Sequence, residues 1–279
     1  MRYLSLSFLV LIGFNLVVWQ GVLERVTPHP LEVYFLDVGQ GDSQLLVFPD
    51  GVEMLIDGGP DKEVLFELEK ILASTDRYID AVFISHAQLD HYGGLREVLG
   101  RYQIGAFIFS GREGEGDPWE AFKDSLVEAK VPIITVGQGD VIRHKDSALE
   151  VLWPSKDFLD HNDLNESSLV MELRSEGVEV LLTGDIGFPS EEKLLETYDM
   201  NTDVLKVAHH GSRYSTSLDF LKEATPAISI IQVGSNRFGH PTEATLQRLS
   251  RAGSMIYRND EDGTVKLVIE DGRVGVSFK

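Results

Sequence analysis

The hydrophobic positions of this chain follow two different periods. Short apolar runs bounded by Gly, Pro or Asp predict strands, as from Glu53 to Ile56 and from Ala81 to Ile84. Longer segments with apolar residues three and four positions apart predict helices, as from Lys62 to Ala73. Strands are expected at 31–36, 43–48, 53–56, 81–84, 106–109, 133–136, 141–143, 149–152, 169–174, 178–182, 204–207, 227–232, 255–258, 265–270 and 274–278, and helices at 62–73, 94–102, 118–129, 190–198, 217–223 and 242–250.

The order of these elements favours a layered α/β fold. A strand-rich stretch is followed by a helical one, and the same order then returns. Such an order suits two mixed sheets packed face to face with helices on the outside, an αββα sandwich. Periodicity alone also fits other α/β layouts, so the fold class needs support from the motifs.

The amino-terminal segment differs from the rest of the chain. Leu4 to Trp19 is nearly all apolar and, with its flanking residues, is long enough to cross a bilayer. No small-x-small cleavage site follows it. We therefore expect a single-pass membrane anchor at 1–23, a linker at 24–30 and one catalytic domain at 31–279 that lies outside the cytoplasm. A cleaved signal peptide and a buried helix are the alternatives.

Composition limits the chemistry. The formal charge of −20 repels nucleic acid at long range, although bound cations can reverse the field inside an acidic cleft. The chain has no cysteine, so disulfides and thiolate metal sites are excluded. Any metal ion must be bound by His, Asp, Glu, Asn or Gln.

The segment from Ser85 to Gly94 carries the strongest chemical signal. It follows a buried apolar strand and contains His86, Asp90 and His91 within six positions, followed by two glycines that let the backbone turn tightly. Loops at strand ends are where ligands gather in α/β proteins. This grouping favours a metal site over an isolated structural histidine.

This segment resembles the H-x-H-x-D-H motif of the metallo-β-lactamase superfamily. Other segments match that superfamily in order and spacing. They are Leu55 to Gly59 with Asp57, Leu182 to Asp185, and Val207 to Ser212 with its paired histidines. Three segments, 36–42, 209–212 and 233–241, narrow the likeness to the hydrolase domain of ComEC-type competence proteins, the channel proteins of DNA uptake. The multi-span channel region of those proteins has no counterpart here, so a separate DNA-uptake channel is an expected partner.

The resemblance implies a set of metal ligands. One site is complete, with Asp90, His91, Asp185 and His210. The other retains His86 and shares Asp185. Where the family has two further histidines, this chain has Gln88 and Asn165.

These two departures from the family pattern bear on the metal. Amide oxygens bind zinc poorly and suit Mn²⁺ or Mg²⁺ better. We therefore expect one tightly held divalent ion, a second weaker one, and better activity with Mn²⁺ than with Zn²⁺.

The remaining candidates surround this centre. Asp57 is expected to orient metal ligands rather than bind metal. His209 is a candidate catalytic residue beside Asp90, for contact with phosphate or protonation of the leaving oxygen, or else a partner of the ligands. Ser212, Asn236 and His240 are candidate substrate contacts, and His240 is also a candidate metal ligand in place of His210. As alternatives, they are a helix cap, a turn residue and a helix-entry residue, respectively.

Charged residues near these motifs allow the same two interpretations. Arg213 and Arg237 are candidate phosphate contacts or solvated surface charges. Asp37 and Asp42 either flank the mouth of the site or form a turn between strands.

The predicted function is hydrolysis of a phosphodiester, most specifically nuclease action on DNA during uptake, with water activated by the bound metal. The alternatives are hydrolysis of another phosphoester or a small ester, and a binding module that kept the fold without catalysis.

Overall fold

The computed structural model describes residues 11–13, 15 and 29–279. Within this part, the first sheet contains eight strands, which are β1 (Leu31–Phe35), β2 (Gln44–Val47), β3 (Glu53–Ile56), β5 (Ala81–Phe83), β7 (Phe107–Phe109), β8 (Ile133–Thr135), β16 (Val265–Glu270) and β17 (Arg273–Phe278). The second contains β9 (Val141–His144), β10 (Ser147–Trp153), β11 (Val170–Ser175), β12 (Val178–Leu182), β13 (Val204–Lys206), β14 (Ile228–Ile231) and β15 (Met255–Arg258). A small ladder pairs β4 (Tyr78–Ile79) with β6 (Gln103–Ile104).

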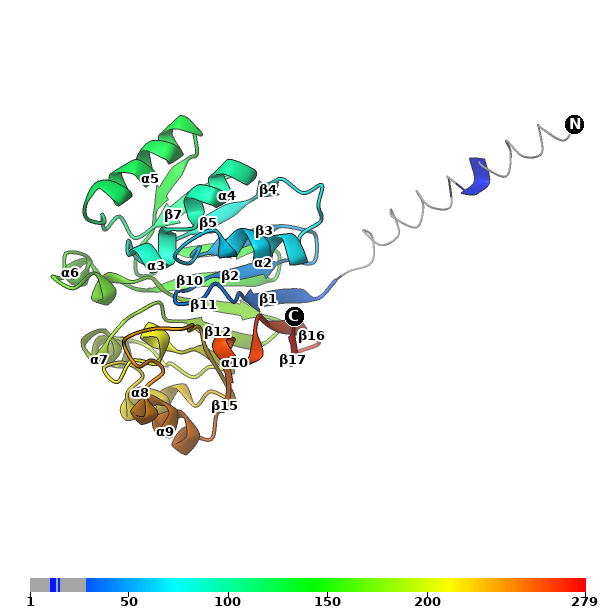
Figure 1. The fold of residues 1–279 in the computed structure, drawn as a ribbon. Helices are drawn as coiled ribbons and strands as arrows, with labels where there is room; N and C mark the ends of the chain where they lie inside the picture. Colours follow the sequence, from blue (N-terminus) through cyan, green and yellow to red (C-terminus); the bar gives the residue numbers. More distant parts are fainter. Residues whose placement is uncertain (1–10, 14, 16–28) are drawn as a thin grey trace, which may run out of the picture.

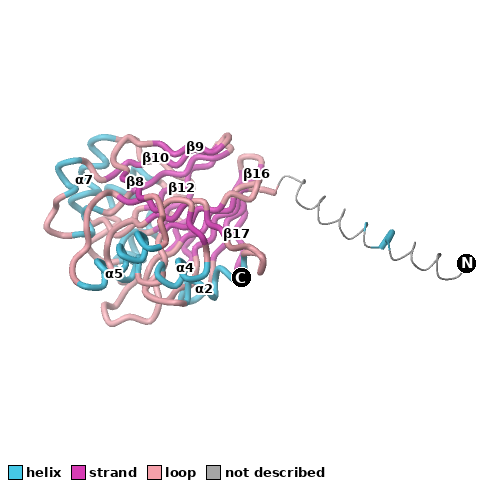
Figure 2. Tube along the Cα trace, turned by 90° about the horizontal axis from the view of Figure 1, so that it is seen from above, coloured by secondary structure: helices cyan, strands magenta, loops and turns pink. Residues whose placement is uncertain are grey.

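The helices lie on the outer faces of the two sheets (Figure 1). The longer ones are α2 (Glu63–Ile71), α4 (Leu95–Arg101), α5 (Asp117–Glu128), α7 (Phe188–Thr197), α8 (Leu218–Ala224) and α9 (Glu243–Ala252). Short helices are α3 (Leu89–Tyr92), α6 (Lys156–Leu159), α10 (Asn259–Asp262) and the 3-10 turns η1 (Leu164–Ser167) and η2 (Ala208–Gly211). Figure 2 shows the strands running through the middle with helices outside them, which confirms the αββα sandwich.

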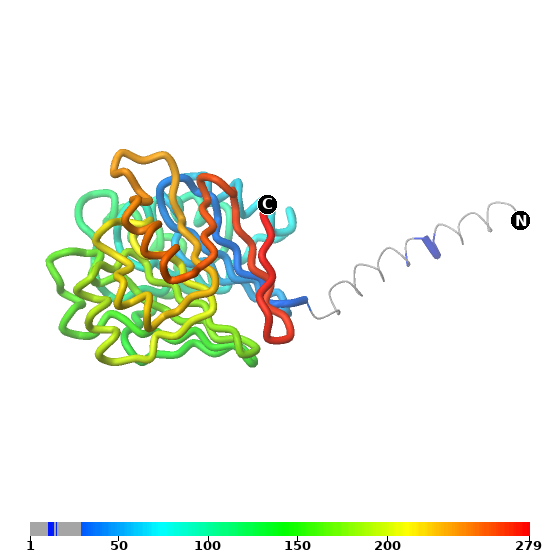
Figure 3. The backbone as a smooth tube through the Cα atoms, turned by 90° about the horizontal axis from the view of Figure 1, so that it is seen from below, coloured from blue at the N-terminus to red at the C-terminus, as the bar shows by residue number. Residues whose placement is uncertain are grey.

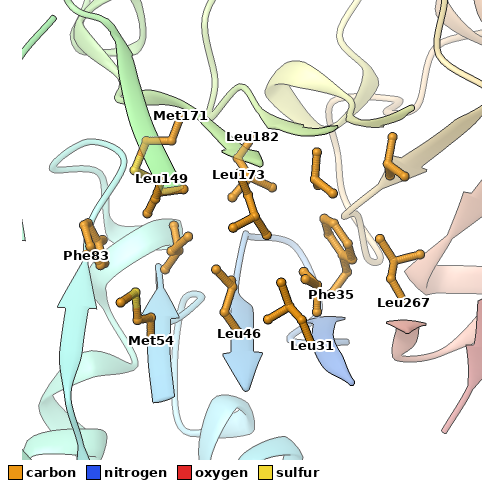
Figure 4. Close-up of a cluster of buried hydrophobic side chains, with 14 of the residues drawn as sticks. Leu31, Phe35, Leu46, Met54, Phe83, Leu149, Met171, Leu173, Leu182 and Leu267 are labelled. Atoms are coloured by element: carbon orange, nitrogen blue, oxygen red, sulfur yellow. The ribbon is translucent and has the colours of Figure 1, made fainter. Parts of the chain in front are cut away.

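Three apolar layers hold the sandwich together. Between the sheets, side chains such as Phe35, Leu46 and Leu182 interdigitate (Figure 4). One outer layer packs α2, α4 and α5 on the eight-stranded sheet, and the other packs α7, α8 and α9 on the seven-stranded sheet. Burial of these apolar faces is the main stabilising term of the fold.

The directions of the strands bring many of their carboxyl ends, and the turns that follow them, to one edge of the sandwich. The eight-stranded sheet runs β17-β16-β1-β2-β3-β5-β7-β8, and the carboxyl-terminal strands lie beside β1 (Figure 3). Strands β3, β5, β7 and β8 are parallel, as are β12 to β15. Since β1 and β3 are both antiparallel to β2, their carboxyl ends reach this edge as well.

The expected strands and long helices are present, with ends shifted by a few residues. The short elements α3, α6, α10, β4, β6, η1 and η2 were not expected, because a few residues contain no measurable period. Most of the predicted anchor, 1–23, and of the linker, 24–30, lies outside the described residues. In the described part, no helix is both long and apolar enough to cross a membrane.

Candidate metal centre

Chain turns from both sheets bring acidic and histidine side chains together at this edge. Asp57 follows β3, His86 follows β5, and Asp90 and His91 lie on α3. From the other sheet, Asp185 follows β12 and the paired histidines follow β13. Overlapping groups of these residues place possible ligand atoms within 4.8 Å of one another. All five predicted metal ligands, His86, Asp90, His91, Asp185 and His210, belong to these groups.

His91 is oriented by Asp57. Its Nδ1 lies 2.9 Å from Oδ2 of Asp57, whose other oxygen accepts a hydrogen bond from the backbone N–H of Ser85 at 2.7 Å. Nε2 of His91 therefore faces the cluster, 3.4 Å from Oδ2 of Asp185. A histidine ligand usually donates its other ring N–H to a carboxylate or carbonyl, so this contact is compatible with the ligand-orienting role predicted for Asp57, which stays a prediction.

His210 is oriented from the opposite sheet. Its Nδ1 donates to the backbone carbonyl of Gln232 at 2.8 Å. Its Nε2 then lies 3.2 Å from Oδ2 of Asp185 and 3.5 Å from Oδ2 of Asp90. Asp185 thus lies between the Nε2 atoms of His91 and His210, as expected for a shared ligand.

His86 completes the imidazole set. Its ring lies 4.1 Å from that of His91, between centroids, and its Nδ1 lies 3.1 Å from Oγ of Ser85. The Ser85 hydroxyl also reaches Asp57 at 2.7 Å, so one serine connects the first two histidines to the same carboxylate. Like the others, His86 directs its Nε2 inward.

The residues fit a divalent cation. Nε2 of His86, His91 and His210 and Oδ1 of Asp185 are buried and have no hydrogen-bond partner among the described residues. Buried polar atoms are almost always satisfied, so unsatisfied atoms concentrated in one place need an explanation. Imidazole nitrogens and carboxylate oxygens are also suitable donors for Zn²⁺ and Mn²⁺.

Two buried residues of the centre were not predicted as such. Asp42 and Lys206 form an ion pair and are 0% and 1% exposed. Nζ of Lys206 also donates to the carbonyl of Gly184 at 2.8 Å and lies 3.6 Å from Oδ1 of Asp185. Oδ1 of Asp42 lies 3.3 Å from Nδ1 of His210. The mouth-of-site interpretation of Asp42 is wrong, because its carboxylate lies inside the centre.

The charges explain why a cation is needed. The carboxylates of Asp42, Asp57, Asp90 and Asp185 gather around a single ammonium, that of Lys206. Neutral imidazoles leave this group with excess negative charge, and all of these carboxylates except Asp90 are buried. Carboxylates held this close without compensation are strongly unfavourable, so the arrangement requires positive charge.

The pKa shifts show the same requirement. Burial, together with the neighbouring His91, lowers the pKa of His86 to about 3. Burial also opposes protonation of His91 and His210, but two carboxylates together outweigh it in each case, Asp185 with Asp57 at His91 and Asp185 with Asp42 at His210, and they raise both pKa values well above the ordinary range. Burial would raise the pKa of Asp185, yet the same histidines hold it well below its usual range. A metal-free centre therefore attracts protons in place of the cation.

The two amides at the expected weaker site contact each other. Nε2 of Gln88 donates to Oδ1 of Asn165 at 2.5 Å, and Nδ2 of Asn165 lies 3.4 Å from Nδ1 of His209. His209 is half-buried beside this pair, and its ring centroid lies 6.2 Å from that of His210. The structure thus groups Gln88, Asn165 and His209 at the margin of the centre.

The predicted substrate contacts differ in their surroundings. The ring of His240 lies 5.7 Å from that of His209, and its Nδ1 is buried without a partner among the described residues. Burial and the neighbouring histidines lower its pKa to about 4. The Asn236 amide instead bonds within its own loop, which matches its alternative interpretation as a turn residue. Ser212 is buried, and its Oγ accepts from the N–H of Tyr214 at 3.3 Å.

Backbone strain marks the positions that aim these groups. His209 and His210 have φ values of 52° and 51°, and Asp57 has 58°. Residues with a Cβ rarely occupy this left-handed region, and each costs roughly 1–3 kcal/mol. Such strain is typical of functional sites. The chain keeps it here because it turns both the Asp57 support and the paired histidines toward the centre.

Comparison with known proteins identifies the class of this fold and site. Residues 36–234 match the sequence model of the metallo-beta-lactamase superfamily. This match covers most of the chain, which therefore belongs to that superfamily, whose members are usually metal-dependent hydrolases.

Individual relatives of this chain belong to a narrower group within the superfamily. ComE operon protein 3 of Bacillus subtilis is 32% identical over 254 residues, covering 84% of this chain and 32% of that protein. Competence protein ComA of Neisseria gonorrhoeae is 29% identical over 257 residues, covering 91% and 34%. Both are competence proteins of the ComEC type, which confirms the resemblance found in the sequence. The chain spans about a third of the length of these relatives.

A solved structure agrees on the fold. The metallo-beta-lactamase fold protein YhfI of Bacillus subtilis superposes with a TM-score of 0.59 at 14% identity, covering 89% of this chain and 100% of that one. At this identity the similarity supports the fold alone.

Proposed function

We propose that this protein is a divalent-metal-dependent phosphodiesterase that cleaves DNA during uptake. One observation carries the proposal: three inward-facing imidazole Nε2 atoms and a carboxylate converge, buried and without partners among the described residues, at one edge of the sandwich. The kinship with competence proteins supports DNA as the substrate.

Asp90, His91, Asp185 and His210 would hold the tightly bound ion, and His86 with Asp185 the weaker one. A bound divalent cation lowers the pKa of its water from 15.7 to about 7 and offsets negative charge on a phosphoryl oxygen. The preference for Mn²⁺ over Zn²⁺ stays a prediction, based on the amides of Gln88 and Asn165 standing where histidines are usual.

Two side chains at the margin have roles in moving protons. Asp90 is the carboxylate of the cluster that solvent reaches, with its side chain 33% exposed. Burial raises the pKa of Asp90, but contact with His210 and the nearby His91 lowers it by more, so Asp90 is ionised. It can accept a hydrogen bond from the attacking water, and its low pKa makes it a weak base for the proton. His209, half-buried beside the centre, is placed to protonate the leaving oxygen or to contact the phosphate.

We also propose a location for the protein. The apolar run from Leu4 to Trp19 supports attachment to the cell membrane by a single pass, with the catalytic domain outside the cytoplasm and a separate uptake channel as partner. Protease protection of the domain in intact cells would contradict this location.

The test uses the purified full chain with a labelled DNA oligonucleotide, in Mn²⁺, in Zn²⁺ and in chelator. We expect cleavage with Mn²⁺, none with chelator, and a loss of at least about 100-fold in Asp185→Asn and His91→Ala, because each removes a ligand of the ion. The control is His144→Ala, which should retain activity, because His144 pairs with Asp50 and lies outside the cluster.

The alternatives have their own outcomes in this test. Hydrolysis of a small phosphodiester or ester without DNA cleavage would favour the other hydrolase functions. Metal binding without hydrolysis of any of these substrates would favour a binding module.

A further inference from the structure

Two loops beside the metal centre each display an arginine next to an exposed aromatic ring. The guanidinium carbon of Arg213 lies 5.6 Å from the ring centroid of Tyr214, and that of Arg237 lies 5.5 Å from the ring of Phe238. The two rings are 67% and 59% exposed. We call these four residues the arginine–aromatic rim. On a chain with a formal charge of −20, paired cations next to the cluster point to an anionic ligand.

Hydrogen bonds to its backbone, some of them only partly buried, anchor the first of these loops. Arg248 donates to the carbonyls of Ser215 and Thr216, each at 2.8 Å. The backbone N–H of Phe188 donates to the carbonyl of Tyr214 at 3.1 Å. The exposed Tyr214 ring is therefore fixed on the surface by its backbone.

The second loop is fixed in a similar way. The Asn236 side chain donates to the carbonyls of Gly234 and His240 at 2.9 and 2.8 Å, and accepts from the N–H of Phe238 at 3.0 Å. At Gly234 a Cβ would lie 2.4 Å from the carbonyl carbon of Gly39, so this loop packs directly on the loop that follows β1. Burial contributes little to the placement of Phe238, since the residue is 59% exposed, and such an exposed ring is typical of a binding surface.

A series of rings connects Phe238, one of the two rings of the rim, with the metal centre. Ring centroids lie 6.2 Å apart from His210 to His209, 5.7 Å from His209 to His240, and 5.8 Å from His240 to Phe238. The last two rings are nearly parallel, at 22°. A flexible polymer whose planar groups stack on Phe238 would therefore have its next backbone units near His240 and His209.

We propose that the arginine–aromatic rim binds single-stranded nucleic acid, with bases stacked on Tyr214 and Phe238 and phosphates at Arg213 and Arg237. Exposed aromatic rings combined with cations are how proteins hold unpaired strands without reading sequence. Duplex bases are already stacked on one another and do not reach such rings. This inference rests on the proposed function, since it supplies the strand that the metal centre cleaves.

The experiment measures binding of a fluorescent 20-nucleotide DNA strand to the full chain, with chelator present so that nothing is cut. We expect Phe238→Ala or Tyr214→Ala to weaken binding about 5- to 100-fold, as loss of one stacked base does. Arg213→Gln or Arg237→Gln should each reduce the slope of log affinity against log salt by about 0.7, as loss of one phosphate contact does.

Matched controls separate the rim from general effects. Phe66→Ala removes a ring on α2 that is 47% exposed and lies beside Lys62. Arg273→Gln removes an exposed charge on β17, at the end of the sandwich opposite the metal centre. Both should bind as the wild type does. A strand of abasic residues should bind the wild type about as weakly as the normal strand binds the double variant Tyr214→Ala with Phe238→Ala.

Two results would overturn the inference: unchanged binding in both aromatic variants, or tighter binding of duplex than of single strand by the wild type. Cleavage of the same strand in Mn²⁺ is read separately. If binding depends on the rim but Mn²⁺ supports no cleavage, the proposed function is refuted and the inference about the rim still holds. Cleavage with rim-independent binding would refute the rim alone.

Discussion

Replacing Lys206 by methionine is expected to destabilise the metal-free protein by about 3–5 kcal/mol, the usual cost of removing one partner from a buried ion pair. Methionine keeps most of the side-chain length, so the change removes the charge and little packing. Asp42, which is 0% exposed, would lose its only cationic partner of the lysine or arginine type in the described structure. The carbonyl of Gly184 would also lose a donor, worth about 1 kcal/mol.

Denaturant unfolding in chelator measures this cost. The double variant Asp42→Asn with Lys206→Met should recover at least about 1 kcal/mol of it, because neutralising both partners leaves no unpaired charge. Lys193→Met, which removes an exposed pair with Glu196, is the control and should leave the unfolding midpoint unchanged. A free energy of unfolding for Lys206→Met within about 1 kcal/mol of the wild-type value would contradict this cost.

Three further predictions concern the centre and its surroundings. Saturation with Mn²⁺ at about 100 times its dissociation constant should add about 2.7 kcal/mol of stability, and calorimetry should show most of this gain absent in His91→Ala. His209→Gly should be about 1 kcal/mol more stable to denaturant than His209→Ala, because glycine adopts the φ of 52° without strain, and equal stability would argue against that strain. Burial and the charges of Asp76 and Asp80 raise the pKa of Glu53 from 4.5 to about 8, so its contribution to stability is complete below pH 4.5 and is lost as the pH rises through 8. Glu53→Gln should therefore flatten the pH dependence of the melting temperature across this window, and an unchanged profile would contradict the shift.

The sequence predicted those parts of the centre that depend on local pattern. The group His86, Asp90 and His91 shares one short loop, and the period of the surrounding strands places that loop at the sheet edge. The supporting role of Asp57 was predicted from the family resemblance.

The rest depends on contacts between distant segments. Asp42 and Lys206 are far apart in the chain and meet only because the two sheets pack together. The signal that could have revealed Lys206 was a lysine inside the apolar strand Val204 to Val207, a position that is costly to bury without a partner. The left-handed backbone of His209 and His210 gives no such signal, because tertiary contacts enforce it against the local preference.

The same holds for the arginine–aromatic rim. No role was predicted for Phe238 or Tyr214 from the sequence, and only the fold shows that both rings are exposed and that Phe238 stacks on His240 beside His209. Asn236 was predicted to be either a substrate contact or a turn residue, and its amide bonds within the loop that displays Phe238. Its effect on binding would then be indirect, through the shape of this loop.

Anomalous diffraction from crystals of the protein grown with Mn²⁺ tests the central claim most directly. We predict a strong anomalous peak about 2.0–2.3 Å from three atoms, Nε2 of His91, Nε2 of His210 and a carboxylate oxygen of Asp185. A well-ordered structure in millimolar Mn²⁺ with no peak among these side chains would contradict it.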